Sequence, residues 1–483
     1  MNPNPFRPTY HFTPPQNWMN DPNGLVYYEG EYHLFYQHNP YGTRWGHMSW
    51  GHAVSADLVT WTHLPIALYE QPEAGYTIFS GSAVIDWSNT SGFGADGRPP
   101  MVAVFTADYR AAPGLETIHI AYSTDRGRTF TEYAENPVID ENESKFGDPK
   151  VFWHAPSARW IMVNIFGHEQ GYVILYSSPD LKTWTRLSEF HAPEHAPGVW
   201  ECPDLFPLPL DGDPGQVHWI LKVNCTRTRD LSAATRYFAG NFDGERFTGA
   251  SPIGASMTSD DGAIYAEVTY NDLPDERRIL VGWLREEAHP ERSWTGAQSM
   301  PRELALRSGP SGPELIQRPL AALQSRRGAH RVSSVPLLEG VHPLTGLDLD
   351  GRALELLAEF DAASAASQPA RRYGLRLTLS TGDEIEIGLD AERAELYVEE
   401  LAVSRRIATP FVPQKGAETV ALRVFLDQAI VEAFAGDGVA ETVAAVTAYM
   451  PFGAGYTGLA LFAEEGSVAA LQVDVWNLNE SRR

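Results

Sequence analysis

The sequence predicts an all-β protein with two domains, a β-propeller followed by a β-sandwich. The chain has 483 residues, more than one hydrophobic core usually holds, so two domains are expected. Its first 300 residues consist of short apolar or alternating runs that are separated by Gly, Pro, Asn and Asp, without a long helical pattern. These runs predict strands at Leu25–Tyr28, Tyr32–Tyr36, Met101–Thr106, Thr117–Tyr122, Lys150–Trp153, Trp160–Ile165, Tyr172–Tyr176, His218–Val223 and Arg278–Trp283.

A turn motif repeats between these runs and favours a propeller over other all-β folds. Each copy has a Ser or Asn, an Asp two residues later and an aromatic residue after the turn. Because a single four-stranded blade cannot bury both of its faces, blades occur as repeated units. Hairpin turns of another all-β fold remain the alternative. The copies are Ser55-Ala56-Asp57 before Trp61, Ser123-Thr124-Asp125 before Phe130, Ser178-Pro179-Asp180 before Trp184 and, in degenerate form, Asn241-Phe242-Asp243 before Phe247.

The composition changes near residue 305. Ser308–Pro313 contains only Ser, Gly and Pro, which is typical of a linker. Alternating runs with polar turns follow, and they predict a sandwich. We therefore expect a propeller over residues 1–305, a linker over 306–330 and a β-sandwich over 331–483. The alternating runs are Tyr373–Leu379, Glu384–Leu389, Ala394–Val398, Thr419–Phe425, Ala429–Phe434 and Leu459–Phe462.

Charge and cysteine content exclude several classes of protein. The formal net charge of −25 disfavours nucleic acid and anionic membranes as partners and suits a neutral small-molecule substrate. Cys202 and Cys225 are too few for a disulfide framework and form no zinc-binding pair. No secretory signal or membrane-spanning run is visible, so we expect a cytoplasmic protein. A homo-oligomer is compatible with the sequence.

Three carboxylates stand in similar surroundings. Asp21, Asp148 and Glu201 each lie among aromatic and apolar residues, with Pro one or two places later and a predicted strand close behind. Any one of them alone is better explained as a turn residue or an ion-pair partner. Because the inner strands of a propeller begin around one channel, however, all three can meet there. Two carboxyl groups cleave a glycosidic bond and a third can stabilise the transition state, although the spacing assigns no roles.

Other catalytic patterns are missing. His38, His47 and His52 match no metal-binding spacing, and packing or hydrogen bonding near a sugar is the better interpretation. The sequence has no serine-hydrolase elbow, phosphate-binding loop or dinucleotide fingerprint. The residues therefore indicate neither a metal site nor a nucleotide cofactor.

Through the segments around the three acids, the chain resembles glycoside hydrolase family 32, the invertase, inulinase and levanase family. The resemblance covers nearly the whole chain and implies a five-bladed propeller, a β-sandwich and retaining cleavage of terminal β-fructofuranosyl units. It also implies that Asp21 is the nucleophile, Glu201 the general acid/base and Asp148 the transition-state stabiliser. The segments that carry it are His11–Ser82, Lys145–Trp153, Val199–Phe206, Ser299–Leu304 and Leu422–Gly438. The matching sugar-contact positions are Asn20, Gln37, Trp45, Phe79 and Ser80, and Gly147 stands at a sixth.

One position departs from the family. The motif Arg-Asp-Pro is Gly147-Asp148-Pro149 here, which removes a group with several hydrogen-bond donors from the sugar subsite. The glycine predicts room for a bulkier sugar, weaker activity on ordinary fructosides or an altered variant. Three alternatives stay open: a fructosyltransferase, a hydrolase of an unusual fructofuranoside and a non-catalytic carbohydrate-binding propeller. An inverting arabinan hydrolase, with carboxyls about 6.5–9.5 Å apart, fits the Asn20–Gly24 context less well.

Overall fold

The strands form two compact units. The structure is a computed structural model that describes residues 6–110, 114–226, 233–249, 264–286, 288–309, 312–347, 353–361, 368–438, 442–451, 453 and 455–479. One unit holds the described residues between Phe12 and Pro313, and the other holds those from Glu314 onward together with residues 6–11. Within the described ranges no helix is long and apolar enough to cross a membrane. Because strands dominate both units, the predicted all-β class is confirmed.

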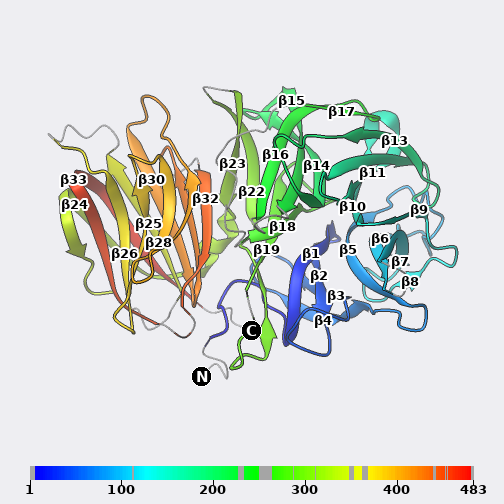
Figure 1. Ribbon diagram of the computed structural model, residues 1–483, viewed down its shortest axis with the longest axis horizontal. Helices are drawn as coiled ribbons and strands as arrows, with labels where there is room; N and C mark the ends of the chain where they lie inside the picture. Colours follow the sequence, from blue (N-terminus) through cyan, green and yellow to red (C-terminus); the bar gives the residue numbers. More distant parts are fainter. Residues whose placement is uncertain are drawn as a thin grey trace. The chain divides into compact units, whose positions relative to one another are not determined.

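The first unit contains five antiparallel blades (Figure 1). The first blade consists of β1 (Asn17–Tyr28), β2 (Glu31–Asn39), β3 (Ser49–Ser55) and β4 (Thr62–Leu68). The second consists of β5 (Tyr76–Ile85), β6 (Met101–Tyr109), β7 (Leu115–Ser123), β8 (Thr131–Glu132) and β9 (Ile139–Ser144). The third consists of β10 (Phe146–His154), β11 (Arg159–Phe166), β12 (Tyr172–Ser178) and β13 (Thr185–Phe190). The last two are β14 (Val199–Leu210), β15 (Asp213–Thr226), β16 (Ala233–Phe242) and β17 (Phe247–Thr248); and β18 (Ile264–Thr269), β19 (Arg278–Leu284), β21 (Ala297–Gln298) and β22 (Arg302–Gly309).

The first strand of each blade faces the axis of the ring. β1 contacts β5, β5 contacts β10, β10 contacts β14, β14 contacts β18, and β18 contacts β1 again. The short strand β20 (Trp294–Thr295) closes the ring by pairing in parallel with Asn17 and Trp18 of β1. The five-bladed propeller is therefore confirmed. All nine strands predicted before residue 300 lie within observed strands.

Apolar side chains join each blade to the next. Since each blade covers a face of its neighbour, the core is a series of layers between blades, and the centre is left for polar groups. Single clusters unite Trp50 of the first blade with Phe105 of the second, Ile120 of the second with Met162 of the third, and Val163 of the third with Phe238 of the fourth.

The repeated Ser–Asp motif occupies the same place in successive blades. In the first three blades it joins the third strand to the fourth, and the Ser hydroxyl donates to the Asp carboxylate two residues later. The Asp then accepts backbone N–H groups of the following turn, as Asp57 does from Val59 and Thr60. In the degenerate fourth copy, Asp243 accepts the N–H groups of Glu245 and Arg246. The predicted repeat therefore corresponds to the blades.

The second unit is a β-sandwich whose two sheets share one long strand. β33 (Tyr456–Leu478) pairs with β26 through its first half and with β25 through its second half. Gly466, with φ of 148°, lies near the change of partner, where a bend is needed. The strands are β24 (Arg327–Pro343), β25 (Ala353–Asp361), β26 (Arg372–Leu379), β27 (Glu384–Asp390), β28 (Glu395–Glu400), β29 (Arg405–Pro410), β30 (Thr419–Asp427), β31 (Ile430–Gly436) and β32 (Thr442–Tyr449).

The region predicted as a linker, 306–330, is largely regular in structure. It contains the end of β22, strand β23 (Gly312–Pro319), a 3-10 helix over Ala321–Arg326 and the start of β24. Residues 310 and 311 lie outside the described part of the chain. The position of the domain boundary stays a prediction.

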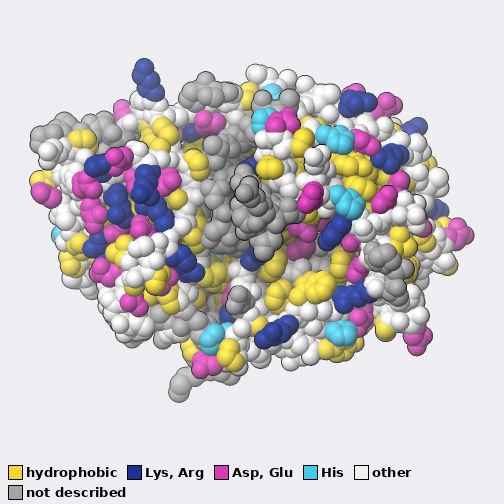
Figure 2. All heavy atoms as spheres, in the orientation of Figure 1, with side chains coloured by type: hydrophobic (Ala, Val, Ile, Leu, Met, Phe, Trp, Pro, Cys, Tyr) yellow, Lys and Arg dark blue, Asp and Glu magenta, His cyan; other side chains and the backbone are white. Residues whose placement is uncertain are grey.

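Ion pairs cover one face of the sandwich, where basic and acidic side chains gather on the left of Figure 2. Arg406 lies 2.8 Å from Glu395 and 3.1 Å from Glu399, and its guanidinium lies 3.8 Å from the ring centre of Tyr397. Arg376 adds a pair with Glu464 at 2.9 Å. Since these charges lie on adjacent strands, they act as cross-strand pairs that hold the sheet in register.

The N-terminal segment is fixed to the sandwich by a buried ion cluster. Asp427 accepts the backbone N–H groups of Thr9, Tyr10 and His11, at 2.6, 2.9 and 3.0 Å. The His11 ring lies between Asp427 and Glu432, with contacts of 2.9 and 3.0 Å. Burial alone lowers the pKa of His11, but the hydrogen bonds to the two carboxylates outweigh it and raise the pKa to about 9.

We expect this cluster to make stability depend on pH. The folded pKa of His11 lies above its ordinary 6.5, so its contribution is fully present below pH 6.5 and is lost as the pH rises through about 9. The shift corresponds to about 3 kcal/mol. Thermal and urea unfolding should be measured between pH 6 and 9.5. As the pH rises over this range, the free energy of unfolding should fall less for His11→Gln than for the wild type. The exposed His342→Gln is the control, and equal pH dependence in all three proteins would contradict the assignment.

Candidate active site

A break in strand pairing marks the inner strand of every blade. Such β-bulges change the direction of side chains and are frequent beside active sites. Asp148, Cys202 and Ala266 have left-handed φ values of 54°, 47° and 54° at these points. The breaks lie between Met19 and Pro22, Ile78 and Gly81, Gly147 and Lys150, Glu201 and Asp204, and Tyr265 and Val268.

The bulges surround one pocket of about 330 Å³. It contains all three predicted acids and five of the six predicted sugar-contact residues, which come from the first, second, third and fourth blades. Gly147 is the predicted residue that does not line it. The pocket is lined by Asn20, Asp21, Gln37, Trp45, Phe79, Ser80, Lys145, Asp148, Glu201, Cys202, Thr226, Tyr265, Trp283 and Arg285.

Asp21 receives hydrogen bonds on both carboxylate oxygens. Ser80 Oγ donates to Oδ2 at 2.6 Å, and Asn20 Nδ2 donates to Oδ1 at 3.1 Å. The Cys202 thiol lies 3.7 Å from Oδ2. Burial raises the pKa of Asp21, and these three donors oppose the rise because they stabilise the ionised form. Asp21 is therefore held in one orientation, with its charge balanced by neutral donors.

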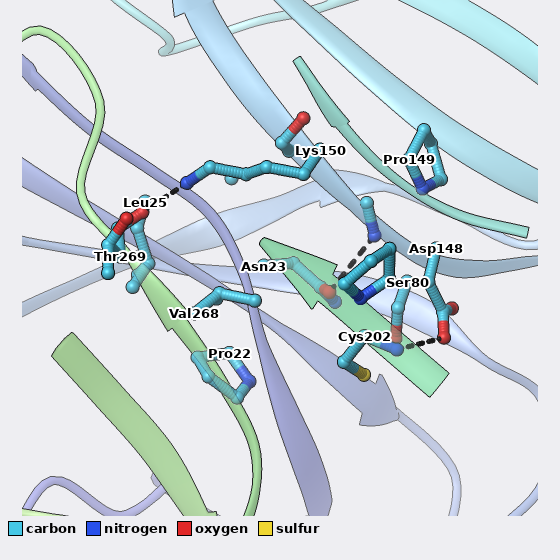
Figure 3. Close-up of a pocket in the computed structure, with 14 residues that line it drawn as sticks. Pro22, Asn23, Leu25, Ser80, Asp148, Pro149, Lys150, Cys202, Val268 and Thr269 are labelled. Atoms are coloured by element: carbon cyan, nitrogen blue, oxygen red, sulfur yellow. Dashed lines mark hydrogen bonds between the residues drawn. The ribbon is translucent and has the colours of Figure 1, made fainter. Parts of the chain in front are cut away.

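Asp148 accepts the backbone N–H of Cys202 at 2.8 Å, as the dashed line in Figure 3 marks. Burial raises the pKa of Asp148 to about 7, with further contributions from the charges of Asp21 and Glu201, while the Cys202 N–H opposes the rise. Because the charges of Asp21 and Glu201 affect the pKa of Asp148, the protonation states of the three carboxyl groups are coupled. Lys222 in turn donates to the Cys202 carbonyl at 3.0 Å and so holds the bulge that supplies the N–H.

Glu201 is paired with a tyrosine from the fifth blade. The Tyr265 hydroxyl donates to Glu201 Oε2 at 2.5 Å and lies 2.9 Å from Thr226 Oγ1. Burial raises the pKa of Glu201, the hydrogen bond from Tyr265 lowers it, Asp21 raises it, and Lys145 and Arg285 lower it. A carboxyl group whose proton affinity is raised in this way can act as an acid and then as a base.

A second, narrow cavity continues from the pocket along the axis. It measures about 10 Å³, room for about one water molecule, and all five inner strands line it (Figure 3). Lys150 lies deeper, 3.6 Å from Asp204, and donates to the Thr269 carbonyl. The floor of the pocket is therefore lined by polar groups, among them the ion pair of Lys150 and Asp204. Among the described residues, no group of three or more His, Cys, Asp or Glu side chains is arranged to hold a metal ion.

Comparison with protein families and known proteins identifies this arrangement. The model of the glycosyl hydrolases family 32 N-terminal domain matches residues 11–319, and that of the family's C-terminal domain matches residues 321–477. The chain belongs to glycosyl hydrolase family 32. It is a glycoside hydrolase of the β-fructofuranosidase type, and the resemblance inferred from its sequence is confirmed.

Individual relatives agree with this assignment. A levanase of Bacillus subtilis is 41% identical over 453 residues, which span 90% of this chain and 65% of the levanase. An extracellular exo-inulinase of Aspergillus niger is 35% identical over 90% of this chain and 88% of its own length. The crystal structure of exo-inulinase from Aspergillus awamori superposes with a TM-score of 0.86 at 31% identity, and covers 99% of both chains. A fructofuranosidase from Schwanniomyces occidentalis complexed with fructose also has a TM-score of 0.86, at 27% identity over 99% of this chain and 100% of that one.

The structure explains why this chain has glycine at residue 147, where the family has arginine. A Cβ atom at Gly147 would lie 2.7 Å from Thr106 Oγ1 and 2.9 Å from Thr106 Cγ2. Thr106 is fixed there, since its hydroxyl accepts the Asp148 N–H at 2.9 Å and donates to the Ser80 carbonyl at 3.2 Å. The expectation that glycine leaves room at this position is therefore wrong, because the side chain of Thr106 fills the space.

Several pocket residues escaped the sequence analysis. Tyr265 lies on β18, whose short sequence Ile264–Thr269 contains a buried glutamate and was not predicted as a strand. Arg285 follows β19 and places its guanidinium 5.3 Å from the ring centre of Tyr265 and 5.8 Å from that of Trp283. Lys145 precedes the predicted Asp148 by three residues. Lys145 could have been found from its position, because it is a single basic residue directly before the predicted strand that carries Asp148.

We expect Gly147→Ala to lower both stability and activity. The new methyl group would press on Thr106 and displace the Asp148 backbone, and overpacking of this kind costs about 1–3 kcal/mol. Chemical unfolding and kcat/KM should be measured for Gly147→Ala, Thr106→Ala and the double variant. The double variant should be more stable than the sum of the single effects predicts. Strict additivity would show that the two side chains do not compete for space.

We expect Tyr265→Phe to shift the alkaline limb of the pH–rate profile to higher pH. The variant removes a hydrogen bond that stabilises ionised Glu201, so the pKa of Glu201 rises and its acid form persists further into the alkaline range. The profile of kcat/KM on sucrose, compared with that of the exposed control Tyr69→Phe, measures the shift. A limb that stays in place or moves to lower pH would contradict the assigned hydrogen bond.

Proposed function

We propose that the protein is a retaining, exo-acting β-fructofuranosidase that releases terminal β-D-fructofuranosyl units from sucrose, fructo-oligosaccharides or fructans. The observation that carries the proposal is the convergence of Asp21, Asp148 and Glu201 on one small pocket. Levanase, exo-inulinase and invertase relatives support the choice of sugar. A pocket closed by polar groups at its floor suits the end of a saccharide chain.

In the first step, Asp21 attacks the anomeric carbon while Glu201 protonates the departing glycosidic oxygen. The donors from Ser80 and Asn20 support the ionised form of Asp21 that a nucleophile requires. The raised pKa of Glu201 favours the protonated form that a general acid requires. The products of this step are the released alcohol and a fructosyl ester on Asp21.

In the second step, Glu201 takes a proton from water, which attacks the fructosyl ester and releases fructose. The anomeric carbon carries partial positive charge in both transition states, and a carboxylate beside the ring stabilises it. Asp148 is suited to this role, because the Cys202 N–H fixes its orientation. Burial and the charges of Asp21 and Glu201 raise the pKa of Asp148, and a developing positive charge beside it favours the ionised form.

Aromatic side chains give the pocket a surface for the sugar. Trp45 lines the pocket with 53% of its surface exposed, and its ring centre lies 6.0 Å from that of Phe79. The guanidinium of Arg110 also lies 5.0 Å from the ring centre of Trp45, and this cation–π contact stabilises the position of the indole. An exposed aromatic ring at a pocket rim is suited to stacking against the apolar face of a saccharide.

We expect Asp21→Ala and Glu201→Gln to lower kcat on sucrose by at least about 100-fold, because each removes a group that acts in bond cleavage. Product analysis on sucrose, kestose, inulin and levan should show fructose as the first product. The first-formed anomer, followed by NMR, should retain the β configuration. Near-full activity of either variant would refute the assignment, and larger saccharides at high substrate concentration would indicate transfer instead of hydrolysis.

A further inference from the structure

Lys145 occupies a sharp turn at the edge of the pocket. It joins β9 to β10, has a left-handed φ of 59°, and its carbonyl accepts the Gly167 N–H at 2.7 Å. A non-glycine residue adopts such a backbone at an energetic cost. The turn brings its side chain to the wall of the pocket that also contains Asp148.

The ammonium group of Lys145 has no carboxylate within ion-pair distance among the described residues. The other cation of the pocket wall, Arg285, lies over the rings of Tyr265 and Trp283. The charge of Lys145 nevertheless reaches the pocket, because it lowers the pKa values of Glu201 and of the buried Glu116. Among the residues that the structure describes, the ammonium group of Lys145 thus has no protein acceptor, and its side chain lies on the wall of the pocket.

The chain next to Lys145 supplies no competing side chain. Gly147 does not line the pocket, and Thr106 fills the position that a side chain at residue 147 would need. Phe146 is fully buried in the layer between the second and third blades. Between β9 and Asp148, Lys145 is therefore the one residue that can donate a hydrogen bond into the pocket from its side chain.

We propose that Lys145 binds the terminal fructosyl unit beside Asp148 by donating a hydrogen bond from its ammonium group to the hydroxyl at C3, C4 or C6 of that unit. The proposal rests on the fructosidase function above and names a specificity-determining residue of the same site. An ammonium group is a compact donor on a flexible stem, whereas a guanidinium presents a rigid fork to two acceptors. Lys145 can therefore donate to one hydroxyl without requiring a second acceptor in a fixed position beside it.

The test compares Lys145→Met, which keeps most of the length of the side chain without its charge, with Lys145→Arg and the exposed control Lys415→Met. On sucrose, Lys145→Met should lower kcat/KM by about 10- to 100-fold, the usual effect of losing a charged hydrogen bond. Lys145→Arg should retain more activity than Lys145→Met, and Lys415→Met should equal the wild type. Thermal unfolding of each variant checks the fold.

A panel of sucrose analogues, each lacking the hydroxyl at C3, C4 or C6 of the fructosyl unit, identifies the contact. On one analogue the wild type should fall to the level of Lys145→Met, so that the ratio of their kcat/KM values approaches 1, while the other two analogues keep the full ratio. A second readout is pH: loss of the ammonium charge should shift the alkaline limb to higher pH, since Lys145 lowers the pKa of Glu201.

The outcomes separate this inference from the proposed function. The role of Lys145 would be overturned if Lys145→Met kept the kcat/KM of the wild type, or if the ratio of their kcat/KM values fell equally on all three analogues. Either result would count even if Asp21→Ala and Glu201→Gln are inactive. A wild-type enzyme that cleaves no fructoside would overturn both proposals.

Discussion

The active site depends on a backbone constraint, the β-bulge in the inner strand of each blade. A regular strand directs alternate side chains to its two faces, both of which are packed against neighbouring blades. The bulges at Asp148 and Cys202 instead turn polar groups toward the axis, with left-handed φ values that the surrounding sheets must stabilise. Buried partners do this, such as Lys222 at the Cys202 carbonyl. The rigidity of the five blades is thereby used to place groups that are far apart in the sequence.

The same geometry creates the electrostatics that catalysis needs. Burial raises the pKa values of all three carboxyl groups, and the charge of Asp21 adds to the rise at Asp148 and Glu201. The donors differ between them: Asp21 has hydroxyl, amide and thiol neighbours, Asp148 has a backbone N–H, and Glu201 has a phenol. These different surroundings suit three similar side chains to the proposed roles of nucleophile, stabiliser and acid/base. Lys145 and Arg285 add positive charge beside Glu201.

Much of this architecture could be predicted from the sequence, because propeller blades repeat and the acids share a local pattern. The Ser–Asp turns marked four blades, and proline after each acid marked three inner strands. β18 escaped because six residues with a buried glutamate resemble no apolar strand. Tyr265 and Arg285 escaped with it, since their approach to Glu201 depends on ring closure. The space at Gly147 was misjudged because its occupant, Thr106, lies 41 residues earlier on another blade.

Covalent trapping tests the central claim most directly. Glu201→Gln incubated with β-fructofuranosyl fluoride needs no acid to release fluoride but lacks the base for the second step, so the fructosyl ester should accumulate. Peptide mass spectrometry should then find one fructosyl unit on the peptide that contains Asp21, and none in Asp21→Ala/Glu201→Gln. A label on Asp148, or fluoride release without any covalent adduct, would contradict the assignment of the three carboxyl groups.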